Sequence, residues 1–125
     1  MRRLARTPEA PARARRFIRK VAGPDIPPEK LEDALLLTSE LVANATRHVD
    51  PSLGDSLGVS ATTGDGCLTV TVSDPGAGFE RRRVSSPATR ETGGWGLVLV
   101  ERIAARWDVV SSETGTEVSF VVDWT

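Results

Sequence analysis

Two glycine-rich segments of the chain contain residue types that could bind a small anionic ligand. Segment 93–96 (GGWG) lies directly before an apolar run that begins at Leu97. Where such a run forms a helix, glycines in front of it expose backbone amides, and the helix dipole favours an anion such as phosphate. Segment 74–78 (DPGAG) follows a predicted strand. Taken singly, each segment is also explained as a tight turn or a helix cap.

Two common phosphate-binding motifs are excluded by the residues around these glycines. A dinucleotide-binding fingerprint needs a helix directly after its glycines, and no helical pattern follows segment 74–78. A Walker-type phosphate loop needs Gly-Lys-Ser or Gly-Lys-Thr, and the sequence contains neither. Neither motif therefore accounts for the glycines.

The second predicted helix presents three polar side chains at a helical spacing. Glu40, Asn44 and His48 are four residues apart and climb one side of this helix, beside Leu36 and Leu37. The other side carries a broad apolar stripe, formed by Leu31, Ala34, Leu35, Thr38, Leu41, Val42, Ala45 and Val49. A simply solvated helix face is not expected to carry two leucines. We therefore expect another part of the protein to cover the side that presents Glu40 and Asn44.

Three helices and four strands are predicted to position these residues. The first helix begins with Thr7 as N-cap, followed by Pro8 and Glu9, and ends at Ala22 before Gly23. The other predicted elements are helices over 28–49 and 97–106 and strands over 56–62, 67–73, 107–112 and 116–123. Segment 63–66 (TGDG) has the composition of a hairpin turn.

The order α-α-β-β-α-β-β predicts one domain over residues 1–125. Its fold class is an α/β (α+β) two-layer sandwich, with helices on one face of a mixed, mostly antiparallel sheet. A hydrophobic share of 39% and a charged share of 26% are ordinary for a globular domain and exclude collagen, coiled-coil and disordered classes. The single cysteine, Cys67, and the absence of an apolar run near the ~18 residues of a membrane span predict a cytoplasmic location without a membrane contact.

The net charge of −1 conceals a strongly basic N-terminal arm. Residues 1–20 carry eight basic groups and one acid (+7), while the remainder carries eight basic groups and sixteen acids (−8). The eight are Arg2, Arg3, Arg6, Arg13, Arg15, Arg16, Arg19 and Lys20. Such an arm could contact nucleic acid, an acidic partner or its own body. Only Phe17 is interleaved for base stacking, so no direct nucleic-acid contact is expected, and a solvated helix face is the favoured interpretation.

Four motifs in order carry a resemblance to a known family. Segment 39–48 (SELVANATRH) looks like an N box, and segments 74–78 and 93–100 look like a first and a second glycine box. Gly115-Thr116 follows on a late strand. Over residues 9–124 the chain thus resembles the GHKL (Bergerat-type) ATP-binding fold, and most closely its RsbW-like branch of anti-sigma-factor serine kinases.

The resemblance implies that the site binds ATP and Mg²⁺. The Asp74 carboxylate would accept a hydrogen bond from the adenine amine, and the turn with Gly76 and Gly78 would admit the base. Asn44 would offer its amide oxygen to Mg²⁺, a hard cation that prefers oxygen ligands. Glu40 would orient or deprotonate the attacking hydroxyl.

Other residues would contact the rest of the nucleotide. By the same resemblance, the second glycine box would hold the phosphates through Gly94, Trp95, Gly96 and Leu97. Arg47 and His48, at the end of the second predicted helix, could also contact phosphate. Trp95 would also stack on the lid or on a partner. Thr116 would supply a hydroxyl near the adenine. The segment at about 79–95 would be the ATP lid.

The resemblance also implies an activity and partners. The expected function is a protein serine/threonine kinase that transfers the ATP γ-phosphate to a STAS-type anti-anti-sigma protein, with a sigma factor as a further partner. The alternative is a nucleotide-gated protein-binding module without kinase turnover. Only residues 1–6 are available for the strand that the family places before the first helix. That strand is expected to be shortened or lost, which leaves a homodimer open.

Overall fold

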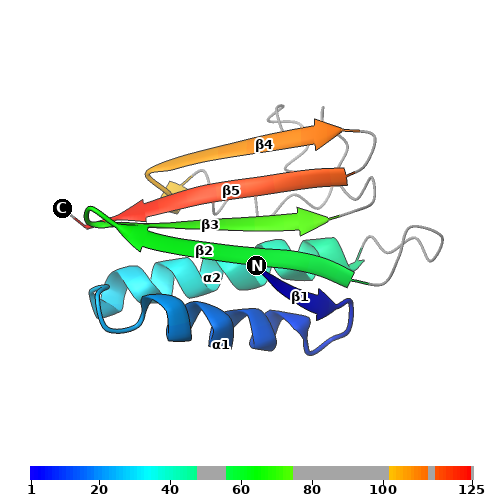
Figure 1. Ribbon diagram of the computed structural model, residues 1–125, viewed down its shortest axis with the longest axis horizontal. Helices are drawn as coiled ribbons and strands as arrows, with labels where there is room; N and C mark the ends of the chain where they lie inside the picture. Colours follow the sequence, from blue (N-terminus) through cyan, green and yellow to red (C-terminus); the bar gives the residue numbers. More distant parts are fainter. Residues whose placement is uncertain (48–55, 75–101, 113–114, 125) are drawn as a thin grey trace.

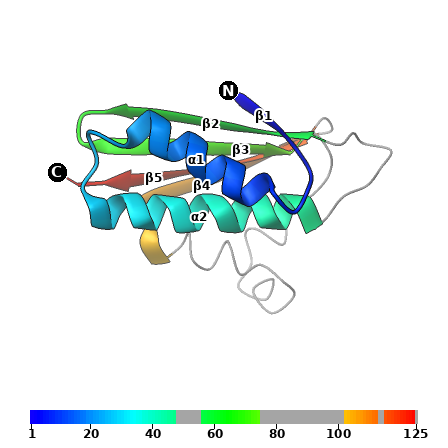
Figure 2. The same cartoon turned by 90° about the horizontal axis from the view of Figure 1, so that it is seen from below.

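The computed structural model describes residues 1–47, 56–74, 102–112 and 115–124. They form five strands and two helices: β1 (Arg2–Ala5), α1 (Ala10–Ala22), α2 (Pro28–Arg47), β2 (Ser56–Gly64), β3 (Cys67–Asp74), β4 (Arg106–Ser112) and β5 (Gly115–Asp123). The strands make one sheet in the order β1-β2-β3-β5-β4. Both helices lie on the same face of this sheet (Figures 1 and 2). The predicted two-layer α+β fold is therefore confirmed.

All four strand pairings among the described residues are antiparallel. The sequence predicted a mixed, mostly antiparallel sheet, whereas the described part of the sheet contains no parallel pair. For β2 and β3 the reason lies in their connection. Asp65 and Gly66 both have positive φ, 54° and 74°, and form a two-residue turn between the paired residues Gly64 and Cys67. Such a turn reverses the chain directly, so the strands that it joins must be antiparallel.

Helix α1 packs through small side chains that are spaced along one stripe. Its buried residues are Ala10, Ala14, Ile18 and Ala22, which recur every four residues and face one side of the helix. The helix begins later than predicted: Glu9, not Thr7, is the N-cap. The Thr7 carbonyl instead accepts the amide of Ala10 at 3.0 Å, which makes a tighter turn in front of the helix.

Helix α2 buries more of its circumference than the apolar stripe requires. Leu37 is fully buried and Asn44 is 1% exposed, whereas Leu36 is 40% exposed. On the side of the helix that carries Asn44, the Leu37 side chain is therefore buried, whereas the Leu36 side chain is exposed to solvent. Since Glu40 lies between these directions on the helical wheel, it is half-buried.

The sheet presents alternate side chains to the helices. In β3 the buried residues are Leu68, Val70, Val72 and Asp74, so the acidic residue continues the apolar row. Val72 pairs with Val118 of β5, and Asp74 pairs with Thr116. The core thus ends in a polar pair where β3 ends.

Strand β1 is present, which corrects the expectation that it could be lost. It has four residues and pairs with β2 in the register Leu4↔Leu57. Leu4 is 6% exposed and anchors the strand to the core. Leu4 is the one buried residue of the strand, and its other three residues are exposed.

The described end of the third predicted helix lies earlier than expected. Residues 102–103 are helical, and Arg106, the predicted last helical residue, begins β4 instead and pairs with Val121. Its neighbours Trp107 and Val109 pack on the core at strand spacing, which favours the strand at this point. No helix in the described residues is long and apolar enough to cross a membrane.

Candidate functional site

Three of the four buried polar side chains among the described residues lie on elements that meet at one end of the two-layer sandwich. Among the described residues, the buried polar or charged side chains are Thr38, Asn44, Asp74 and Thr116. Three of these four belong to the set that the sequence predicts to bind nucleotide. Burial of a polar group is unfavourable unless it is hydrogen-bonded, so a group of them in a small core indicates a specific role.

Asp74 and Thr116 are brought together by strand register. Asp74 is the last residue of β3, and its Cα partner in β5 is Thr116. Both are 2% exposed. Because they continue the row of core residues, both belong to the helix-facing side of the sheet. A carboxylate accepts hydrogen bonds and a hydroxyl both donates and accepts, so two such groups at adjacent positions can bind the polar edge of one planar ligand.

Arg6 joins this group, and the sequence did not single it out. Its guanidinium Nη2 forms an ion pair with the Asp74 carboxylate, and the two side chains are 2% and 1% exposed. Its Nη1 donates to the carbonyl of Ala45 at 3.1 Å. In the sequence Arg6 is one of eight basic residues in the first twenty, and nothing in its local pattern distinguishes a buried arginine from an exposed one.

Helix α2 contributes the residues predicted for metal binding and catalysis. Asn44 precedes Ala45, the residue that contacts Arg6, so the last turns of α2 lie beside the end of β3. Glu40 is one turn earlier and half-buried. Arg47 is the last residue of the helix. The helix thus carries a buried amide beside the residue that Arg6 contacts, and a half-buried carboxylate one turn earlier.

The remaining predicted residues lie outside the described part of the chain. These are His48, Gly76, Gly78, Gly94, Trp95, Gly96 and Leu97, together with the predicted ATP lid at 79–95. Their roles stay predictions from the sequence.

The buried amide of Asn44 is compatible with a Mg²⁺ ion that is held mainly by nucleotide phosphates. No group of three His, Cys, Asp or Glu residues that could hold a metal occurs in the described residues. Mg²⁺ is commonly held by one or two protein oxygens together with substrate phosphates and water. Asn44, with an amide oxygen near the buried end of the sandwich, fits that pattern.

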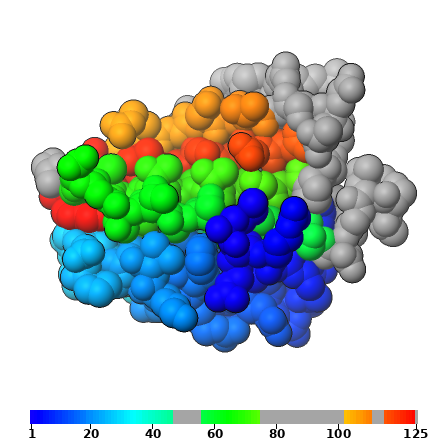
Figure 3. All heavy atoms as spheres, in the orientation of Figure 1, coloured from blue at the N-terminus to red at the C-terminus, as the bar shows by residue number. Residues whose placement is uncertain are grey.

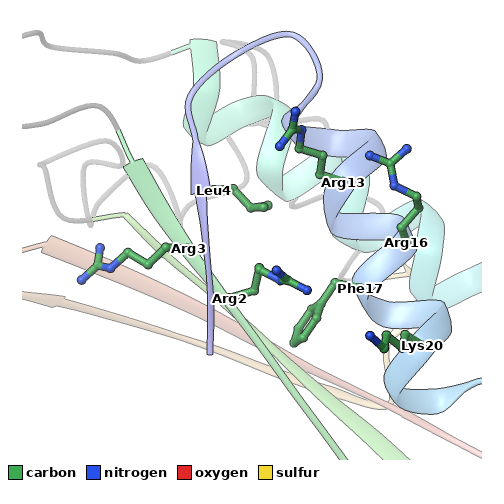
Figure 4. Close-up of a pocket in the computed structure, with 7 residues that line it drawn as sticks. All are labelled: Arg2, Arg3, Leu4, Arg13, Arg16, Phe17 and Lys20. Carbon is green, nitrogen blue, oxygen red and sulfur yellow. The ribbon is translucent and has the colours of Figure 1, made fainter.

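A second surface, on the edge of the sheet, is cationic. A groove of about 250 Å³ lies between β1 and α1 and is lined by Arg2, Arg3, Leu4, Arg13, Arg16, Phe17 and Lys20. Arg2 and Phe17 face each other across it (Figure 4), with the guanidinium carbon 5.8 Å from the ring centroid. The N-terminal residues, dark blue in Figure 3, lie on the surface beside β2. None of the ion pairs within the described residues involves these cations.

The comparisons with known proteins agree with this architecture. The family model described as a histidine kinase-like ATPase domain matches residues 4–122. A blue-light activated histidine kinase from Erythrobacter litoralis EL346 is similar in structure, with a TM-score of 0.64 and 23% identity over 90% of this chain and 40% of that chain. A structure of its histidine kinase domain gives a TM-score of 0.63 and 22% identity, over 90% of this chain and 58% of that one. No protein with a curated description matches the chain.

Proposed function

The chain belongs to the histidine kinase-like ATPase domain family, and we propose that it binds Mg²⁺–ATP and acts as a protein serine/threonine kinase. The proposed substrate is a STAS-type anti-anti-sigma protein, and a sigma factor is the proposed second partner. The chain spans 40% and 58% of the length of the two histidine kinase structures that it resembles. The kinase activity, its residue specificity and its partners are therefore proposals for this chain.

One observation carries the nucleotide site. Three of the four buried polar residues in the described part of the chain, Asn44, Asp74 and Thr116, are those that the motifs assign to nucleotide binding. Their gathering at the end of β3, with Asp74 and Thr116 paired in register, supports adenine recognition at that end.

In the proposed mechanism each residue acts on a different part of the nucleotide. The Asp74 carboxylate would accept a hydrogen bond from the adenine amine. The Asn44 amide oxygen would hold Mg²⁺, and that ion would supply neutralisation of phosphate charge. Glu40 orients the serine or threonine hydroxyl of the partner and accepts its proton while the oxygen attacks the γ-phosphorus. The bond between the γ-phosphorus and the β–γ bridging oxygen breaks, and ADP leaves. The half-buried position of Glu40, one turn from Asn44, supports this role because it combines access for a partner with proximity to the metal ligand.

The cationic groove supports a protein partner with an acidic surface. Five cations line it, and no acidic residue does. Charge of one sign along a groove accelerates the encounter with a partner of opposite charge. The same charges disfavour a homodimer built by pairing two β1 edges, because Arg2 and Arg3 of both copies would then approach each other. A homodimer through another surface stays a prediction.

Calorimetric titration with Mg²⁺–ATP, followed by phosphate transfer to a STAS-type protein, tests the proposal. Asp74→Asn and Asn44→Ala should each weaken ATP binding by tenfold or more, by roughly the energy of one buried polar contact. Glu40→Gln should leave ATP binding nearly unchanged and reduce transfer by about 10²-fold or more. Glu32→Gln is the matched control, because Glu32 is a 71% exposed carboxylate on the same helix.

The outcomes separate the proposed function from its alternative. Absence of ATP binding by the wild-type protein would overturn the nucleotide site and the kinase together. ATP binding without transfer to any STAS-type substrate would favour a nucleotide-gated binding module. Equal transfer by the Glu40→Gln and Glu32→Gln variants would remove Glu40 from the mechanism.

A further inference from the structure

Arg6 contacts two elements of the nucleotide site from a third element outside it. It lies in the connection between β1 and α1. One guanidinium nitrogen pairs with Asp74 at the end of β3, and another donates to the Ala45 carbonyl in α2. The contacts span 68 and 39 residues of sequence. The Arg6 side chain thus connects β3, which carries Asp74, to α2, which carries Asn44.

The contact with Asp74 supplies the counter-charge that its burial requires. A carboxylate that is 1% exposed stays in place as an anion only if it is paired and hydrogen-bonded. Arg6 provides both, since a guanidinium is always charged and donates through a planar fork. A carboxylate has two oxygens with several acceptor positions, so it can accept from Arg6 and from a second donor at once.

The contact with Ala45 completes the end of helix α2. The last carbonyls of a helix have no amide partner within it, and Ala45 is two residues from the end at Arg47. A cation that donates to such a carbonyl also interacts favourably with the helix dipole. Asn44 is the neighbour of Ala45, so this contact holds the predicted metal ligand as well.

We propose that Arg6 is a positioning residue for base recognition, which holds Asp74 as a charged acceptor and thereby sets the preference for adenine. This inference rests on the proposed nucleotide site and adds to it a residue from outside its motifs. Adenine presents an amine to the carboxylate. Hypoxanthine carries a carbonyl oxygen at the same position, so two acceptors would face each other and binding would be weakened.

Without the guanidinium, the Asp74 carboxylate loses the cation with which it forms a buried ion pair. A buried carboxylate that loses its counter-charge is destabilised as an anion, so it is held less firmly in one position as an acceptor. The site then loses the fixed acceptor that distinguishes the amine from the carbonyl. The selectivity between ATP and ITP therefore decreases, in addition to any loss of overall affinity.

The experiment compares the affinities for Mg²⁺–ATP and Mg²⁺–ITP in the full chain by calorimetry. The wild-type protein should prefer ATP by at least about tenfold, because a site built for a hydrogen-bonding group rejects the analogue that lacks it. In Arg6→Met the preference should fall below about threefold, and Arg6→Lys, which keeps the charge but not the fork, should be intermediate. Arg19→Met is the matched control, because Arg19 is a 56% exposed arginine in α1.

The ratio of the two affinities separates positioning from a general structural role. Partial unfolding of a variant lowers the apparent affinity for both nucleotides equally and leaves their ratio unchanged. An unchanged ratio in Arg6→Met, with wild-type ATP binding intact, would overturn this inference alone. Absence of ATP binding by the wild-type protein would overturn the proposed function, and the role of Arg6 with it.

Discussion

Arg6 and Arg2 lie four residues apart in the same basic segment, yet their guanidinium groups are in opposite environments. The side chain of Arg6 is 2% exposed and pairs with a buried carboxylate. Arg2 is exposed on the sheet edge, over the ring of Phe17. In the first environment the charge is needed to compensate another buried charge, and its loss is costly. In the second, water already solvates the charge, so it contributes little to stability but can act on an approaching partner.

The largest effect is expected from removing the buried cation. Arg6→Met leaves Asp74 without its counter-charge, and we expect the free energy of unfolding to fall by about 3–5 kcal/mol. Urea denaturation followed by circular dichroism measures this change. The matched surface pair is Arg19–Glu32, with 4.0 Å between its charged atoms, and Arg19→Met should change stability by less than about 1 kcal/mol. Similar losses in the two variants would mean that burial does not distinguish these pairs.

A smaller effect, of a different kind, is expected from the groove. Reversing two of its charges with Arg16→Glu and Lys20→Glu should change stability by only about 0.5 kcal/mol per site. The same variant should bind a fluorescent oligoglutamate peptide about tenfold more weakly at low salt, because it changes the sign of the local field. Fluorescence anisotropy at two salt concentrations tests this, and the difference should shrink as salt rises.

The control for the groove is Arg102→Glu, which reverses an exposed cation outside it. This variant should retain most of the peptide binding. If both variants lost binding equally, net charge rather than the groove would attract the peptide.

The smallest effect concerns Glu9, at the N-terminus of α1. A hydrogen bond from the Thr7 side chain, aided by the Glu9 backbone amide and the charge of Arg13, holds the pKa of Glu9 below the ordinary value of 4.5. The stabilisation is thus present above pH 4.5 and is lost as the pH falls through the lowered pKa. Thr7→Val should raise the Glu9 pKa towards 4.5, as measured by NMR titration. No change in that variant would assign the shift to the other two groups.

The predictable parts of this fold are those encoded by local pattern. Leu68, Val70 and Val72 alternate with polar residues, and segment 63–66 has a turn composition, so the strand and the hairpin follow from the sequence. The turn is shorter than that segment, because β2 continues to Gly64 and only Asp65 and Gly66 connect it to β3. The helices were also predicted, although the N-cap was placed at Thr7 instead of Glu9. Element ends are decided by one or two hydrogen bonds, which local composition does not specify.

The part that could not be predicted depends on contacts between distant segments. Arg6 resembles its seven basic neighbours in the sequence, and only the tertiary structure places it beside Asp74. The motifs indicate Asn44 and Asp74 because a family resemblance marks them, while Arg6 belongs to no motif. Strand β1 could not be predicted for the same reason. Its four residues are too few to show an alternating pattern, and their strand conformation depends on pairing with β2.

The link from Arg6 to Asp74 also has a consequence for the order of folding. Helices α1 and α2 and the β2–β3 hairpin join residues that are close in sequence, whereas this ion pair closes a loop of 68 residues. Closure of long loops is entropically costly and tends to follow the formation of local structure. We therefore expect the N-terminal corner to close late, with substitutions at Arg6 accelerating unfolding more than they slow refolding. During synthesis on the ribosome, the contact between Arg6 and Asp74 could then form only after β3 has emerged, and the pairing of Asp74 with Thr116 only after β5 has followed.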